Sequence, residues 1–193
     1  MQRIILASAS PRRAELLRAA GIDFDVMPAN VDESVHASET PNAYVRRVAE
    51  AKVRALAGRA EGRIVLAADT TVVIEGEMLG KPIDDQDAKR MLRMLSGRSH
   101  DVLTAVALYR GPGGSAPLET VAVERTQVEF APLTDSEIDW YVATGEPRDK
   151  AGAYAIQGYG SRFVTHINGS YANVVGLPVA LVMEMFKAAG FRP

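Results

Sequence analysis

Short apolar runs that lie next to helix starts recur along this chain and constrain its fold more than any other feature. Residues 4–7 form one such run and are followed by Ser10-Pro11, and Thr40-Pro41 precedes another run at residues 64–68. Serine and threonine are favoured N-cap residues, and proline suits the first helical position, so each pair predicts a helix N-terminus. The apolar runs are typical of buried strands. The alternation of strands and helices predicts an α/β fold.

The same signals locate the remaining elements. Residues 75–77 predict the turn of a hairpin between residues 72–74 and 78–79, and the long central strands are expected to be antiparallel in part. The length allows one domain or two closely joined lobes, and we assign residues 1–193 to a single domain. The expected strands are residues 3–7, 24–27, 64–68, 102–109, 120–130 and 163–167, and the expected helices are residues 11–20, 41–58, 85–96, 135–144 and 178–189.

The composition is that of an ordinary globular protein, with 47% hydrophobic and 24% charged residues. A formal net charge of -2 argues against non-specific binding to nucleic acid. Because the chain contains no cysteine, disulfides, zinc thiolates and thiol nucleophiles are excluded. The apolar runs are shorter than a secretory signal or a membrane span requires. We therefore expect a cytoplasmic protein without nucleic-acid or membrane partners.

Residues 8–13 carry the strongest local sign of chemistry. They connect a predicted buried strand to a predicted helix start, where free N–H groups and the helix dipole attract anions. The Walker pattern of a P-loop is absent, and a capped surface helix with solvated arginines explains the segment about as well as a phosphate site. Two hydroxyl groups and two guanidinium groups add donors that suit phosphate oxygens, namely those of Ser8, Ser10, Arg12 and Arg13.

Asp69 directly follows the apolar run at residues 64–68. A carboxylate is seldom placed in a buried run unless it is paired or bound to a metal. Ligands collect where strands end in open α/β sheets, which favours a functional role over a simple turn cap. Asp69 is therefore a candidate to hold a divalent ion, to activate a water molecule, or to do both.

Three further charged residues carry weaker signals. Lys81 lies on a rigid turn, and Lys52 lies one helical turn after Val48. Glu33 is an acid in a polar loop. Taken alone, each lysine is more often a solvated surface side chain, and the acid is equally consistent with simple solvation.

The segment 149–158 combines small residues with one tyrosine, Tyr154, and one glutamine, Gln157. Small residues allow a planar ligand to approach the backbone closely, and a glutamine side chain can both donate to and accept from the edge of a base. A tight glycine-rich loop without any ligand is at least as consistent with this composition.

Taken together, these segments resemble the Maf family of nucleotide pyrophosphatases. The resemblance covers nearly the entire chain, in order, and the combination is far more specific than any single motif. The matching residues are Leu6-Ala7-Ser8-Ala9-Ser10-Pro11-Arg12-Arg13, Val31-Asp32-Glu33, Lys52, Ala68-Asp69-Thr70, Gly80-Lys81-Pro82, Ser96-Gly97, Gly145-Glu146-Pro147, Lys150-Ala151-Gly152-Ala153-Tyr154, Ile156-Gln157-Gly158 and Gly176-Leu177-Pro178.

The resemblance implies a mixed, twisted sheet flanked by helices, with a cleft between two lobes as in Maf and ITPase-like proteins, and often a homodimer. It also implies hydrolysis of a nucleoside triphosphate between its α- and β-phosphates with a divalent cation, Mg²⁺ or Mn²⁺. By position, Asp69 resembles the catalytic acid, which accepts a proton or binds the metal, and Glu33 resembles a second acid near the metal. The residues that resemble the triphosphate-binding set are Ser8, Arg12, Arg13, Lys52 and Lys81.

Within the family, the chain resembles the dTTP/UTP branch at Arg12, Thr70 and Gln157, where the sister branch acting on methylated GTP typically has Trp, Gln and Glu. The implied products are a nucleoside monophosphate and pyrophosphate. A single methyl group separates dTTP from dUTP, so we expect a house-cleaning enzyme that accepts dTTP, UTP, dUTP and modified pyrimidine nucleotides. The alternative left open is a nucleotide-binding regulator of septum formation or cell division without significant catalysis.

Overall fold

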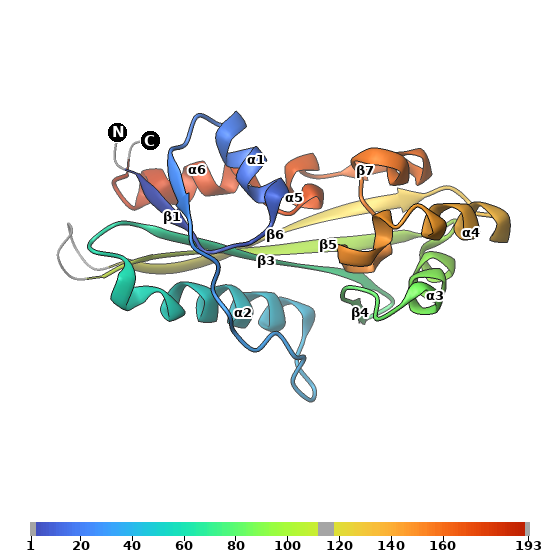
Figure 1. Cartoon of the computed structure of the whole chain (residues 1–193), viewed down its shortest axis with the longest axis horizontal. Coiled ribbons are helices and arrows are strands. Elements are labelled where there is room, and N and C mark those ends of the chain that lie inside the picture. Colours follow the sequence, from blue (N-terminus) through green and yellow to red (C-terminus); the bar gives the residue numbers. More distant parts are fainter. Residues whose placement is uncertain (1–2, 112–117, 192–193) are drawn as a thin grey trace. The chain divides into compact units, whose positions relative to one another are not determined.

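The computed structural model describes residues 3–111 and 118–191 of the chain (Figure 1). Its strands are β1 (Ile4–Leu6), β2 (Phe24–Val26), β3 (Val65–Ile74), β4 (Glu77–Leu79), β5 (Ser99–Arg110), β6 (Leu118–Phe130) and β7 (Val164–Asn168). Its α-helices are α1 (Pro11–Ala19), α2 (Pro41–Ala55), α3 (Asp85–Leu95), α4 (Asp135–Ala143), α5 (Tyr171–Val175) and α6 (Val179–Ala188). Short 3-10 segments are η1 (Ala57–Arg59), η2 (Glu146–Asp149), η3 (Ala151–Ala153) and η4 (Gly158–Phe163).

Within the described residues, the strands form one seven-stranded sheet in the order β2-β1-β3-β5-β6-β7, with β4 paired to β3. Strand β1 is parallel to both of its neighbours, with Ile4 opposite Phe24 and Ile5 opposite Val65. Strand β4 is antiparallel to β3, and β7 is antiparallel to β6. The sheet is therefore mixed and accompanied by helices, which confirms the predicted α/β class.

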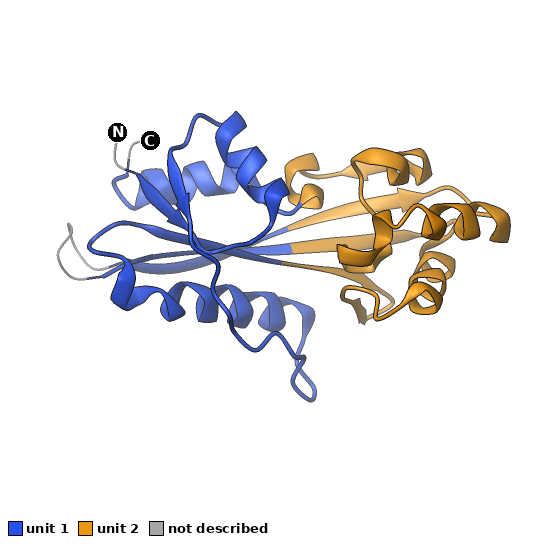
Figure 2. Ribbon diagram, viewed as in Figure 1, with its two compact units in different colours: residues 1–69, 104–124, 176–193 blue, residues 70–103, 125–175 orange. Residues whose placement is uncertain are grey.

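The chain divides into two compact units (Figure 2). Unit 1 is built from described residues within the ranges 1–69, 104–124 and 176–193, and unit 2 from residues 70–103 and 125–175. Each of the long strands β3, β5 and β6 contributes residues to both units, because the first three boundaries along the chain fall within these strands, and the fourth follows α5.

Strand β3 extends further than the sequence analysis predicted. The expected strand stopped at residue 68 and a separate hairpin strand began at residue 72, whereas β3 runs without interruption from Val65 through Asp69 to Ile74. Residues 70–73 are all β-branched and favour the extended conformation, and the charge of Asp69 is tolerated because it is paired. The turn that follows, Glu75-Gly76, has φ of 50° and 83°, as the commonest two-residue hairpin turn requires. The predicted hairpin is therefore confirmed, whereas the prediction that Asp69 ends its strand is wrong.

In unit 1, successive side chains along β3 point to opposite faces of the sheet. Leu66 and Ala68 join an apolar core with Leu17 of α1 and Phe186 of α6. The intervening side chains, including that of Asp69, point to the opposite face, along which α2 runs (Figure 1). The helices of unit 1 thus cover both faces of its strands.

In unit 2, the core is rich in aromatic rings. Phe130 of β6 packs edge-on against Tyr154, with ring centroids 4.7 Å apart, and Tyr141 of α4 packs in the same way against Phe163, at 5.0 Å. His100 of β5 joins the cluster 5.0 Å from the Phe130 ring. Edge-to-face contacts of this kind add to the stabilisation from burial. The segment after α4 is thereby anchored to the sheet.

The capping signals located the helix starts well. Ser10, Thr40, Asp84 and Thr134 each accept a backbone hydrogen bond as the N-cap residue of α1, α2, α3 and α4. Helix α2 ends at Ala55, short of the predicted residue 58, and η1 follows. Helix α5 and the 3-10 segments were not predicted, because they are too short to show a periodic pattern. Among residues 3–111 and 118–191, no helix is long and apolar enough to cross a membrane.

Candidate active site

Lys52 lies on the buried stripe of α2 rather than on its solvated edge. Lys52 is only 7% exposed, so its interpretation as a solvated surface lysine is wrong. An ammonium group at such a position needs a partner of opposite charge. The stripe repeats at intervals of three and four residues and consists of Val45, Val48, Ala49, Lys52 and Val53.

Two carboxylates supply the partners of Lys52. Its Nζ lies 2.8 Å from Oδ1 of Asp69 and 2.7 Å from Oε1 of Glu33. Asp69 is buried at 6% exposure, whereas the side chain of Glu33 is 47% exposed. The three residues come from α2, β3 and the loop before α2, and all belong to unit 1. The fold thus joins three separate sequence motifs into one charged cluster with one buried and one accessible acid.

Asp69 retains an unused oxygen atom. Its Oδ2 is buried and has no hydrogen-bond partner among the described residues. Burial raises the pKa of Asp69, and the positive charges of Lys52 and Arg13 oppose that shift. A buried carboxylate oxygen without a donor calls for an explanation, such as a cation or a water molecule.

The loop that carries Glu33 is fastened to α2 by two residues. The hydroxyl group of Tyr44 donates to the backbone oxygen of Glu33 at 3.0 Å. The guanidinium group of Arg47 donates to the backbone oxygen of Ser34 at 2.8 Å and to both carboxylate oxygens of Glu39, at 2.7 and 2.8 Å. The sequence analysis missed both residues, because a tyrosine and an arginine on an amphipathic helix form no motif. Their role appears only once the loop is seen to fold back on α2.

Arg13 is fixed at the start of α1. Its Nη1 donates to Oγ of Ser8 at 3.1 Å, and its Nε donates to the backbone oxygen of Gly176 at 2.8 Å. Ser10 acts as the N-cap, with its Oγ accepting from the backbone N–H of Arg13 at 3.5 Å. Burial lowers the pKa of Arg13, and the negative charges of Asp69 and Glu33 oppose this shift. Arg13 is therefore part of the charged surroundings of the acids and not a freely solvated arginine.

The structure assigns the predicted residues to both units. Arg12 is half-buried in α1 of unit 1. Thr70, Lys81 and Gln157 belong to unit 2, where Thr70 is half-buried in β3 and the other two side chains are exposed. The residues that the structure brings together within unit 1 are Ser8, Ser10, Arg13, Glu33, Lys52 and Asp69.

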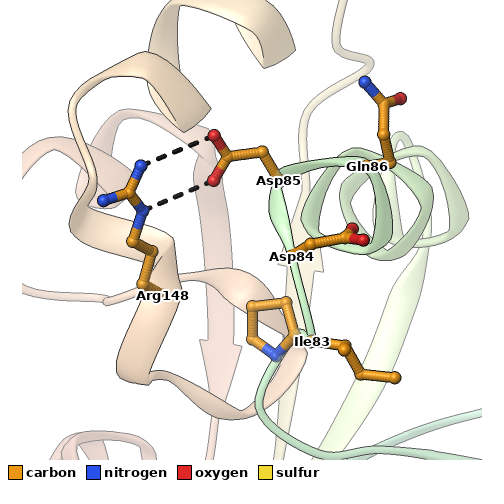
Figure 3. Close-up of a pocket in the computed structure, with 6 residues that line it drawn as sticks. Ile83, Asp84, Asp85, Gln86 and Arg148 are labelled. Atoms are coloured by element: carbon orange, nitrogen blue, oxygen red, sulfur yellow. Dashed lines mark hydrogen bonds and ion pairs between the residues drawn. The ribbon is translucent and has the colours of Figure 1, made fainter.

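A pocket of about 510 Å³ in unit 2 is a poor site for a triphosphate (Figure 3). Arg148 is held by Asp85, with nitrogen–oxygen distances of 3.4 and 3.5 Å, and the side chain of Asp84 caps α3. A phosphate group in this pocket would therefore meet two carboxylates and an arginine that is already paired. None of the predicted site residues is among its lining, which consists of Pro82, Ile83, Asp84, Asp85, Gln86 and Arg148.

The acids of unit 1 fit a magnesium or manganese ion that is shared with a substrate. Among the described residues, no group of three or more histidine, cysteine, aspartate or glutamate side chains forms a ready-made metal cage. Magnesium is usually held by one or two carboxylates together with waters and substrate phosphates, so a full cage is not required. Asp69 with its unused Oδ2 and Glu33 with its accessible carboxylate match that smaller set.

A family model described as Maf-like protein matches residues 3–189. The chain belongs to the Maf family. This membership confirms the resemblance drawn from the sequence motifs, and it extends over almost the whole chain. The charged cluster of Asp69, Lys52 and Glu33 is thus the candidate active site of a Maf protein.

Several relatives of this Maf protein are similar over nearly their full length. A dTTP/UTP pyrophosphatase from Anaeromyxobacter sp. is 57% identical over 188 residues, which cover 97% of this chain and 90% of that protein. A dTTP/UTP pyrophosphatase from Symbiobacterium thermophilum is 52% identical over 191 residues, covering 99% of this chain and 96% of that protein. The solved structure of the Staphylococcus aureus Ham1 protein has a TM-score of 0.52 at 15% identity and covers 97% of this chain and 100% of that chain. The Ham1 likeness supports the fold alone.

Proposed function

We propose that this Maf protein hydrolyses pyrimidine nucleoside triphosphates, with dTTP and UTP as the principal substrates, to a nucleoside monophosphate and pyrophosphate. The observation that carries the proposal is the buried ion pair of Lys52 and Asp69, at 2.8 Å, with an accessible second acid, Glu33, on the same ammonium group. The names of the relatives support the same activity. A nucleotide-binding regulator without catalysis is not favoured, because those relatives are named as pyrophosphatases.

The positive charges have the task of neutralising the triphosphate. A triphosphate carries several negative charges that repel an attacking water molecule, and fixed cationic donors reduce this repulsion. Arg13 is held in place by Ser8 and Gly176, so its guanidinium group is oriented before a substrate binds. The other members of the proposed phosphate-binding set are Arg12, Lys52, Lys81 and the hydroxyl groups of Ser8 and Ser10.

The two acids of unit 1 are proposed to bind a divalent cation, Mg²⁺ or Mn²⁺. When bound, such a cation neutralises phosphate charge and makes a coordinated water molecule more acidic. Asp69 is the acid that we assign to orienting or deprotonating the attacking water, because its Oδ2 is not engaged by any described residue. Lys52 holds the other oxygen, Oδ1, and so fixes the orientation of the carboxylate.

Selection of the base is assigned to Gln157, Thr70 and Arg12, which match the dTTP/UTP branch of the family. The side-chain amide of Gln157 both donates and accepts, as does the edge of uracil or thymine. An ionised glutamate at this position would only accept and would suit the donor-rich edge of guanine. Since one methyl group is worth only about 1 kcal/mol in an apolar pocket, dUTP is expected to be accepted with dTTP.

A nucleotide panel tests the proposal. The purified protein is incubated with dTTP, UTP, dUTP, ATP and 7-methyl-GTP, with and without a chelator, and pyrophosphate and orthophosphate are measured separately. We expect pyrophosphate from the pyrimidine nucleotides and its loss with the chelator. Release of orthophosphate would indicate a phosphomonoesterase, and binding without any cleavage would indicate a regulator.

The substitution Gln157→Glu tests the assignment of the base reader. It is expected to lower the kcat/KM for UTP relative to that for 7-methyl-GTP by about 10- to 1000-fold, the range set by mismatched buried polar groups. An unchanged ratio would show that Gln157 does not read the base. We further propose a homodimer, as the family resemblance implies, and a cytoplasmic location, and size-exclusion chromatography with light scattering measures the oligomeric state.

A further inference from the structure

Gln157 is presented by a short segment whose course depends on one carboxylate. The side chain of Gln157 is exposed, and the next residue, Gly158, begins η4 with a φ of +74°. Such a segment has few side chains of its own with which to hold a shape. The feature that holds it is Glu146 of η2, which belongs to the same unit 2.

The carboxylate of Glu146 accepts three hydrogen bonds. The backbone N–H groups of Tyr159 and Gly160 donate to Oε2 and Oε1, each at 2.9 Å, and the hydroxyl group of Tyr141 donates to Oε1 at 2.8 Å. Hydrogen bonds to a charged acceptor are stronger than those between neutral groups. The backbone just after Gln157 is therefore folded around this carboxylate.

The glycine after Gln157 makes room for the carboxylate. A Cβ atom added to Gly158 would lie 2.4 Å from Oε2 of Glu146, closer than such atoms approach. Its positive φ also disfavours any other residue. Gly158 thus satisfies two requirements at once, because it leaves room for the Glu146 carboxylate and adopts a positive φ.

The backbone before Gln157 is tied to the same pair of side chains. The N–H group of Ala155 donates to the hydroxyl oxygen of Tyr141 at 3.1 Å, and that hydroxyl group in turn donates to Glu146. Ala155 lies two residues before Gln157, and Tyr159 lies two residues after it. The Tyr141–Glu146 pair therefore accepts hydrogen bonds from the backbone on both sides of Gln157.

We propose that Glu146 and Tyr141 are positioning residues for substrate selection, which hold Gln157 in the orientation that discriminates a pyrimidine triphosphate from a guanosine triphosphate. This inference rests on the proposed function, in which Gln157 reads the base. Both residues belong to unit 2 and hydrogen-bond to the backbone around Gln157, so the expected effect is on the choice between substrates. Without these hydrogen bonds the amide of Gln157 can take several orientations, and binding a base then carries an additional cost in conformational entropy.

The test is a double-mutant cycle on the discrimination ratio, defined as kcat/KM for UTP divided by kcat/KM for 7-methyl-GTP. Glu146→Gln keeps the size of the side chain but places an N–H₂ group against a backbone N–H, and Tyr141→Phe removes only the hydroxyl group. We expect each substitution to lower the ratio by about tenfold or more. In a Gln157→Ala background, Glu146→Gln should lower the ratio no further, because the residue through which it acts has been removed.

Glu137→Gln is the matched control. Its carboxylate also accepts a backbone N–H and a hydroxyl group, from Thr134 at the start of α4, but it does not touch the segment around Gln157. Near-ultraviolet circular dichroism checks that each variant is folded. If Glu146→Gln does not fold, Tyr141→Phe is used as the test variant in its place. An unchanged ratio in the folded variants, or an equal further loss in the Gln157→Ala background, would overturn the inference. Failure of the wild type to release pyrophosphate from any triphosphate would instead overturn the proposed function.

Discussion

Nζ of Lys52 lies 2.8 Å from Oδ1 of Asp69, and both residues are more than nine-tenths buried. A buried ion pair of this kind is weak support for stability, because removing two charges from water costs about as much as their attraction returns. The pair leaves the other oxygen of Asp69 without a partner in the described structure. A charged pair kept at such a cost is better explained by chemistry than by folding.

Replacement of Asp69 by asparagine is expected to abolish most of the activity. The amide would keep the shape of the side chain but could neither accept a proton nor hold a cation well. We expect the variant Asp69→Asn to lose at least about two orders of magnitude in turnover, the usual scale for a positioned acid–base group. Lys52 keeps Glu33 as a partner, so the thermal unfolding midpoint should change little. Pyrophosphate release and calorimetry measure the two effects, and near wild-type turnover would remove Asp69 from catalysis.

Replacement of Arg13 should impair every triphosphate alike. The substitution Arg13→Ala removes a guanidinium group that is proposed to contact phosphate, so we expect kcat/KM to fall by roughly 10- to 100-fold for dTTP, UTP and dUTP. Arg13→Lys should not restore it, because one ammonium group cannot reproduce the separate hydrogen bonds to Ser8 and Gly176. Steady-state kinetics on the three nucleotides check this, and a loss confined to one base would assign Arg13 to base recognition.

Replacement of Arg47 tests whether the loop of Glu33 must be fixed. Arg47→Met removes the hydrogen bonds to Ser34 and Glu39, so Glu33 should spend less time near Lys52. We expect kcat/KM to fall by roughly 10- to 100-fold, as for a misplaced catalytic group. Arg54→Met is the control, because Arg54 lies on the same helix but pairs with Glu50 and Glu119. Equal activity of the two variants would show that the hydrogen bonds of Arg47 to the Glu33 loop are not needed for activity.

The stability of the fold should decline in mild acid because of His100. This residue is 3% exposed, its Nε2 lies 2.8 Å from the hydroxyl oxygen of Tyr154, and burial lowers its pKa to about 4. The unfolded chain therefore binds a proton near pH 6.5 that the folded chain resists. The free energy of unfolding should be highest above pH 6.5 and should fall by up to roughly 3 kcal/mol as the pH approaches 4.

Urea unfolding at several pH values measures this dependence. In His100→Gln the amide can still bond to Tyr154 but cannot be protonated, so the part of the pH dependence between 6.5 and 4 that belongs to His100 should disappear. Carboxylates contribute their own dependence, which the difference between wild type and variant removes. An identical slope in the two proteins would show that His100 is not responsible.

Much of this protein could be predicted from local sequence. Cap residues and prolines determined where α1 and α2 begin, because the hydrogen bonds of a cap involve only neighbours in the chain. The family motifs predicted Asp69, Lys52 and Glu33 as site residues, and the structure shows that the three side chains lie together. The periodicity of α2 placed Lys52 one helical turn after Val48 but did not show that it is buried, because its partner is not apparent in the sequence.

The partnerships themselves were decided by tertiary structure alone. Asp69 lies in the middle of a strand, and the alternation of side chains along β3 points it toward α2. The ion pair with Lys52 therefore exists only when the sheet and the helix are packed together. The hydrogen bonds that hold the Glu33 loop and the Gln157 segment likewise form only when the loops are folded. Arg47 donates to a backbone oxygen of the first, and Glu146 accepts from a backbone N–H group of the second. Local sequence controls short-range hydrogen bonds and periodic burial. The pairing of charges distant in the chain depends on which elements pack together, and no local pattern encodes that.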